Sequence, residues 1–120
     1  MARILISEPH EDVRRLLVRM VERLGHEPLA PRVAAPRELT SADLFLLEPV
    51  APLGAALARA ARLLAPSMPL ICASVQAPPP ELLASGVLFE ACLAKPFTLE
   101  QLGAAIEQAL CRRGACAQSA

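Results

Sequence analysis

The chain has 120 residues, the size of one domain, and 54% of them are hydrophobic, which is enough for a sizeable core. Its 12 basic and 12 acidic side chains cancel and only 2% of its residues are aromatic, which excludes the basic, base-stacking surface of a nucleic-acid-binding protein. No apolar run reaches the roughly 18 residues of a membrane span. The apolar start is also too short for a signal peptide, so we expect a cytoplasmic protein without membrane contact.

The start of the chain predicts a strand followed by a helix. Arg3–Ser7 is a short apolar run typical of a buried strand. Apolar residues then recur at intervals of three and four over residues 13–24, which predicts an amphipathic helix that begins at Glu11 or Asp12. Acidic residues suit the positive end of the helix dipole, and Gly25 is a typical residue at a helix C-terminus.

The next segments predict a weak strand, a short helix and a central strand. Residues 26–31 form at best a short edge strand, because prolines cannot donate to a β-ladder. Residues 32–41 should carry a second helix, and because this segment contains Pro36 we expect only one or two helical turns. Leu44–Leu47 is apolar without a break and too short for a buried helix, so it predicts a central parallel strand that ends at Glu48.

The second half of the chain continues the alternation of helix and strand. Alanine-rich residues 55–65 predict a third helix, which Pro66 ends. Residues 69–73 predict a fourth strand, closed by Ser74. After three consecutive prolines, residues 81–84 predict a short fourth helix.

The last elements are a strand at Ala91–Ala94 and a helix at Leu99–Leu110. Thr98 and Gln101 have the spacing of a capping box at the start of this helix. Strand and helix thus alternate five times, which predicts an α/β fold in three layers with a parallel sheet and short second and fourth helices. We expect this domain to span residues 1–111 and residues 112–120 to be a frayed tail.

The four cysteines do not predict a metal site. Cys72 and Cys92 lie in apolar, strand-like segments and are expected to be small core residues. Cys111 and Cys116 are not spaced as a Cys-x-x-Cys pair, and the chain has only two histidines to add ligands.

Five segments, in this order and spacing, resemble the receiver domain of bacterial response regulators over nearly the whole chain. The Lys-Pro-Phe segment is the most specific of them. The segments are Arg3-Ile4-Leu5-Ile6 with Val13-Arg14-Arg15-Leu16-Leu17; Arg23-Leu24-Gly25-His26-Glu27; Asp43-Leu44-Phe45-Leu46-Leu47-Glu48 with Pro52; Pro69-Leu70-Ile71; and Ala94-Lys95-Pro96-Phe97.

The resemblance implies a flavodoxin-like (βα)5 fold, sheet order 2-1-3-4-5, and a CheY-like module of two-component phosphorelay signalling. In such domains a pair of acids after the first strand and an aspartate after the third hold Mg²⁺, and the aspartate accepts a phosphoryl group. A Ser or Thr after the fourth strand and a Lys after the fifth bind the phosphoryl oxygens. The matching positions are Glu8 and Pro9 for the acid pair, Glu48 for the phospho-acceptor, Ser74 and Lys95 for phosphate binding, and Ser74 and Cys92 for the switch residues.

Two departures from this pattern predict a degenerate receiver that is not an enzyme. Pro9 has no coordinating side chain, and Glu48 carries its oxygens about one C–C bond, roughly 1.5 Å, further out than an aspartate would. Mg²⁺ accepts only a narrow range of ligand distances, so Glu8 and Glu48 are weak candidate ligands and we expect no cofactor. Without a metal, we expect an ion pair between Glu48 and Lys95; the alternative is that Glu48 is a tolerated, solvated acid. Ser74 is expected to cap the following loop more than to bind phosphate.

The expected partner is a protein, either a histidine kinase or an output protein, that binds the face of the fourth helix, fifth strand and fifth helix. Two other interpretations stay open. One is a weakly active phospho-acceptor receiver that uses Glu8 and Glu48. The other, from a different class, is a small flavodoxin-like ligand binder, although the turn at residues 7–10 lacks the glycines that phosphate cofactors need.

Overall fold

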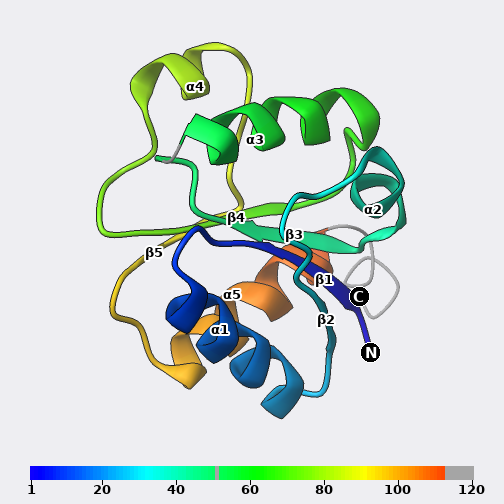
Figure 1. The fold of residues 1–120 in the computed structure, drawn as a ribbon, viewed down its shortest axis with the longest axis vertical. Helices are drawn as coiled ribbons and strands as arrows, with labels where there is room; N and C mark the ends of the chain where they lie inside the picture. The colour runs from blue at the N-terminus through cyan, green and yellow to red at the C-terminus, as the bar shows by residue number, and fades with distance from the viewer. Residues whose placement is uncertain (51, 113–120) are drawn as a thin grey trace.

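Five parallel strands form one sheet in the order β2-β1-β3-β4-β5, which confirms the predicted flavodoxin-like topology (Figure 1). The computed structural model describes residues 1–50 and 52–112. The strands are β1 Arg3–Ser7, β2 Glu27–Leu29, β3 Leu44–Leu47, β4 Leu70–Ser74 and β5 Ala91–Ala94. The helices are α1 Glu11–Arg23, α2 Pro36–Ser41, α3 Pro52–Leu64, α4 Pro80–Ala84 and α5 Leu99–Leu110.

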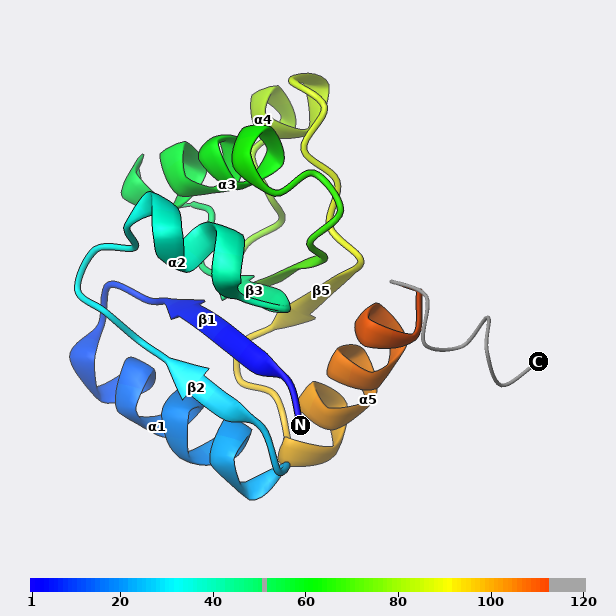
Figure 2. The same cartoon turned by 90° about the vertical axis from the view of Figure 1, so that its right-hand side faces the viewer.

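The sheet is the middle of three layers. Helices α1 and α5 cover one face, and α2, α3 and α4 lie on the other (Figures 1 and 2). Successive residues of a strand point to opposite faces, so Leu44 and Leu46 pack towards α1 and α5, and Phe45 and Leu47 towards α2 and α3. All four are buried, as expected for a central strand covered on both sides.

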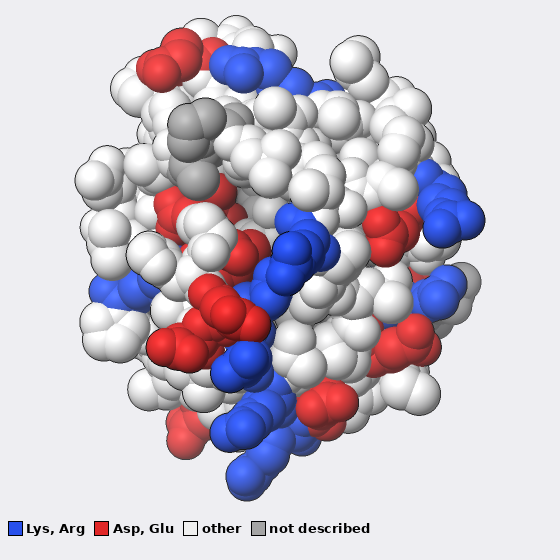
Figure 3. Space-filling view, viewed as in Figure 1, with Lys and Arg blue, Asp and Glu red and all other residues white. Residues whose placement is uncertain are grey.

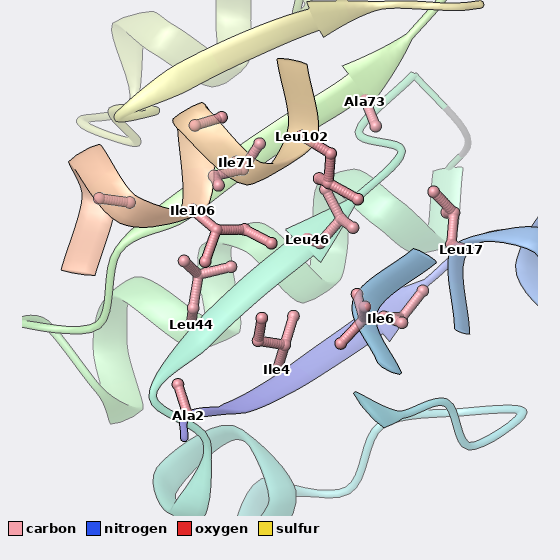
Figure 4. Close-up of a cluster of buried hydrophobic side chains, with 13 residues drawn as sticks. Ala2, Ile4, Ile6, Leu17, Leu44, Leu46, Ile71, Ala73, Leu102 and Ile106 are labelled. Atoms are coloured by element: carbon pink, nitrogen blue, oxygen red, sulfur yellow. The ribbon is translucent and has the colours of Figure 1, made fainter. Parts of the chain in front are cut away.

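Two hydrophobic clusters therefore hold the layers together. Figure 4 shows the cluster beneath α1 and α5, in which Ile4 and Ile6 of β1 lie beside Leu44 and Leu46 of β3. Helix α5 contributes Leu102, Ala105, Ile106 and Ala109, all of them buried, and the partly buried Leu110 packs against the same cluster. The predicted capping box is also present, because Thr98 Oγ1 accepts from Gln101 N at 3.0 Å and Gln101 Oε1 accepts from Thr98 N at 2.8 Å.

Helix α2 has the expected one to two turns within residues 32–41. It begins at Pro36, whose missing N–H removes no helical hydrogen bond in the first turn. The start predicted for the third helix is wrong. Helix α3 begins at Pro52, three residues before the predicted start, because its first turn tolerates a proline in the same way. Gly54 lies in the first turn of α3 and is a poor helix former, which explains why the sequence alone suggested a later start.

The placement of Cys92 in the core is also wrong. Cys72 is buried, but Cys92 is exposed. Strand β5 lies at the edge of the sheet, and α4 has only five residues, of which Leu82 alone is buried. A helix this short does not cover the face of β5 on which Cys92 lies.

In the predicted tail at residues 112–120, Arg112 is described and forms an ion pair with Glu90 at 3.1 Å; the remainder lies outside the described residues. No helix within residues 1–50 and 52–112 is long and apolar enough to cross a membrane.

Candidate functional site at the carboxyl edge of the sheet

Four strands bring the candidate site residues to one edge of the sheet. Glu8 follows β1, Glu48 follows β3, Ser74 is the last residue of β4 and Lys95 follows β5. They line a hollow of about 380 Å³ together with Pro9, His10, Val13, Val50 and Val75. Acidic groups gather on this side of the molecule, beyond the ends of the strands (Figure 3). The structure thus brings five of the six predicted site residues together.

Lys95 is the centre of this group. It is the only lysine in the chain, and its Nζ donates to Glu8 Oε1 and, at 3.4 Å, to Glu48 Oε2. The expected Glu48–Lys95 ion pair is therefore present. The contact between Lys95 and Glu8 was not predicted, and it involves the more deeply buried carboxylate: the exposed fraction of the side chain is 1% for Glu8, 11% for Glu48 and 17% for Lys95.

Backbone and hydroxyl donors complete the binding of both carboxylates. His10 N donates to Glu8 Oε2 at 3.2 Å, and Val50 N donates to Glu48 Oε1 at 3.2 Å. Ser74 Oγ donates to Glu48 Oε1 at 2.8 Å and accepts from Gln76 N at 3.2 Å, so it has the expected capping role as well as a site contact. The carboxylates are thus held by short local turns and by Lys95, and each oxygen has a donor.

Gly54 packs directly against the backbone of Glu48. A Cβ atom at Gly54 would lie 1.9 Å from the carbonyl oxygen of Glu48, far closer than any tolerated contact. Only glycine permits the first turn of α3 to approach the end of β3 so closely. Gly54 therefore sets where the Glu48 side chain leaves the sheet.

The sixth predicted site residue, Cys92, is not among the residues that line the hollow. It lies on β5 in register with Cys72 of β4. Burial raises the pKa of the Cys72 thiol to about 12; the neighbouring Cys92 thiol and the Glu48 carboxylate add to the rise, and Lys95 opposes it.

A magnesium ion, which a receiver fold implies, does not fit these residues. The Lys95 ammonium group contacts both carboxylates, and Pro9 offers no oxygen where a second acid would be needed. Mg²⁺ keeps several waters in an octahedral shell, but the Glu8 carboxylate is almost fully buried. Among the described residues, no group of three or more His, Cys, Asp or Glu could hold a metal ion.

Sequence comparison identifies no relative: no family model matches the chain, and no curated protein matches it. Solved structures do match. A response regulator receiver domain protein from Clostridium thermocellum is 21% identical, with 97% of this chain and 99% of that one covered and a TM-score of 0.76. The chemotaxis protein CheY4 of Vibrio cholerae is 20% identical, with 91% and 98% covered and a TM-score of 0.75.

A third structure, the receiver domain of a sensor histidine kinase from Pseudomonas aeruginosa, is 19% identical with a TM-score of 0.77, and the match covers 91% of this chain and 97% of that one. That domain has a magnesium ion coordinated in its active-site cleft. These identities are low, so the likeness shows a shared fold: the chain is a receiver-like domain in architecture.

Proposed function

We propose that this chain is a degenerate receiver module of two-component signalling, which acts by contact with another protein and not by taking up a phosphoryl group. The receiver fold over nearly the full chain supports the signalling class. The observation that carries the degenerate assignment is the position of Lys95 between Glu8 and Glu48.

Phosphoryl transfer to a carboxylate gathers negative charge, so a divalent cation and a free ammonium group are needed to offset it. Here the ammonium group of Lys95 already neutralises carboxylates in the resting protein. The nucleophile position is also engaged, because Glu48 Oε1 accepts from Ser74 and from the backbone of Val50. A phosphoryl donor would have to displace these contacts without the help of a metal ion.

A signalling module of this kind needs a surface for a protein partner. The partner classes that fit a receiver fold are a histidine kinase and an output protein. Exposed apolar side chains support a contact surface around α4 and the end of β4, since Val75 is 73% exposed, Leu83 42% and Leu88 71%. We place the partner on the face formed by α4, β5 and α5.

Incubation with Mg²⁺ and acetyl phosphate, followed by intact-protein mass spectrometry, tests the absence of phosphorylation. We expect no phosphorylated species from the natural sequence. A matched variant, Pro9→Asp with Glu48→Asp, restores both short carboxylates and is expected to gain a phosphoryl group that hydroxylamine removes. An acyl phosphate on Glu48 of the natural sequence would overturn the proposal and favour a weakly active phospho-acceptor.

A further inference from the structure

Two thiols lie side by side on β4 and β5. Cys72 and Cys92 are register partners in the parallel β4–β5 pair, so their side chains point to the same face of the sheet. That face is the one covered by α2 and α3, because Leu70, two residues before Cys72, belongs to the hydrophobic cluster beneath these helices.

Their spacing suits a covalent bond. Adjacent strands in a sheet lie about 4.7–4.9 Å apart, and a disulfide joins Cα atoms about 4.4–6.8 Å apart. Side chains of register partners stand nearly parallel, so the sulfur atoms approach bonding distance only if one strand moves slightly. Strand β5 lies at the edge of the sheet and pairs with β4 only. It is therefore less constrained than a strand that is paired on both sides.

The two thiols differ in access. Cys92 is exposed and Cys72 is buried. Figures 1 and 2 show α4 near one end of α3 and away from β5, which agrees with the exposure of β5 residue Cys92. A small oxidant can therefore reach Cys92 directly, whereas Cys72 is reached only through Cys92.

We propose that Cys72 and Cys92 form a redox-responsive dithiol, which hydrogen peroxide converts to a cross-strand disulfide beneath the Glu48–Lys95 site. The Cys92 thiolate attacks one peroxide oxygen, the O–O bond breaks, and the departing hydroxide takes a proton to become water. The Cys72 sulfur then attacks the Cys92 sulfenic acid: the S–S bond forms, the S–O bond breaks, and the hydroxide leaves with the Cys72 proton as a second water. Two electrons pass from the thiols to the peroxide.

The raised pKa of Cys72 supports this order of events, because a thiol that stays protonated is a poor first nucleophile. The bond would join the two strands that carry Ser74 and Lys95, two residues after Cys72 and three after Cys92. Oxidation therefore changes the relative positions of Ser74 and Lys95 without modifying either side chain. This inference does not depend on whether the chain can be phosphorylated.

The test is peptide mapping of the full chain after treatment with hydrogen peroxide. A glutamate-specific protease cuts after Glu81, Glu90 and Glu107, so Cys72, Cys92 and the Cys111–Cys116 segment fall on three different peptides. We expect a linked peptide pair containing Cys72 and Cys92, which dithiothreitol separates, with loss of both free thiols on denaturing alkylation.

Two variants serve as matched controls. Cys72→Ser is expected to leave a sulfenic acid on Cys92 that dimedone traps, and Cys92→Ser is expected to leave Cys72 unreactive. The proposal is overturned if the natural chain forms no Cys72–Cys92 link under conditions that oxidise Cys92 in the Cys72→Ser variant. A link from Cys92 to the Cys111–Cys116 peptide instead would overturn it equally.

Discussion

At the scale of single residues, the charge of Lys95 is shared between two carboxylates of unequal burial. Glu8 has almost no contact with solvent, and its two oxygens are bound by Lys95 and by the backbone of His10. A buried carboxylate that loses its only ionic partner is strongly unfavourable, because nothing replaces the lost solvation. Lys95 is therefore expected to be a structural residue of the site.

The first prediction concerns this group. Lys95→Ala should lower the free energy of unfolding by about 2–4 kcal/mol, since it leaves Glu8 unpaired. Glu8→Gln in the same protein should recover part of that loss, giving a coupling energy on the order of 1 kcal/mol or more in a urea-unfolding double-mutant cycle. Strictly additive losses would show that the contact is not energetically significant.

A surface pair provides the control for this cycle. Arg3 and Glu27 form an ion pair at 3.4 Å, and their side chains are 49% and 46% exposed. Arg3→Ala is expected to cost only about 0–1 kcal/mol, because water and salt screen the pair.

The second prediction concerns alkaline pH. The pKa of Cys72 is about 12 in the folded chain against an ordinary value of 9.0. Between these values the unfolded thiol loses its proton while the folded one keeps it, so the unfolded state binds fewer protons and stability falls as pH rises. The contribution of Cys72 is complete below pH 9 and is lost on going towards pH 12.

Unfolding of the reduced protein by urea at several pH values between 9 and 12 measures this loss. Cys72→Ala should show a shallower fall in stability than the natural sequence over that range. Parallel slopes for the two proteins would contradict the assignment.

Sequence reasoning identified most of these residues but not all of their contacts. Glu48 and Lys95 could be paired in advance, because the ends of β3 and β5 meet at one edge of a parallel sheet. The burial of Glu8 could not be predicted from the sequence, because an acidic residue before Pro9 in a turn is usually solvated. Cys92 was wrongly predicted to lie in the core. An apolar neighbourhood in the sequence does not reveal whether the helix over that face of the sheet is long enough to cover the residue.

At the scale of the elements, the junction between β3 and α3 determines where Glu48 lies. The first turn of α3 passes so close to Glu48 that Gly54 cannot carry a side chain. The sequence places Pro52 and Gly54 in an apparent loop, which hides both the early start of α3 and the reason for the glycine. Only the packed structure shows that this glycine is needed for close approach and not for an unusual backbone angle.

The third prediction tests this junction. Gly54→Ala should destabilise the chain by about 1–3 kcal/mol or more, because backbone atoms must move to admit the methyl group. Gly103→Ala in α5 is the control: its Cβ would meet only the side-chain methyl groups of Leu24, at 3.0 and 4.0 Å, and alanine favours a helix. Thermal unfolding of the two variants compares them directly. Equal effects would mean that the approach of α3 to Glu48 is not a tight constraint.

At the scale of the whole molecule, the fold was more predictable than the site. Five alternations of strand and helix and the apolar run at Leu44–Leu47 are sufficient to predict a parallel three-layer architecture, because right-handed crossovers leave few other topologies. The site depends instead on side-chain contacts between residues 87 positions apart, such as Glu8 and Lys95. No local pattern encodes these contacts.

The central question for this molecule is whether Lys95 closes the carboxyl edge of the sheet or leaves it open to a cation and a phosphoryl group. The most direct measurement is a Mg²⁺ titration followed by amide NMR, with and without beryllofluoride, using the Pro9→Asp, Glu48→Asp variant as the responsive control. We expect no saturable shifts around Glu8, Glu48 and Lys95 in the natural sequence. Saturable shifts at these residues would contradict this expectation, since they would show that the edge still binds a cation and can take part in phosphorylation.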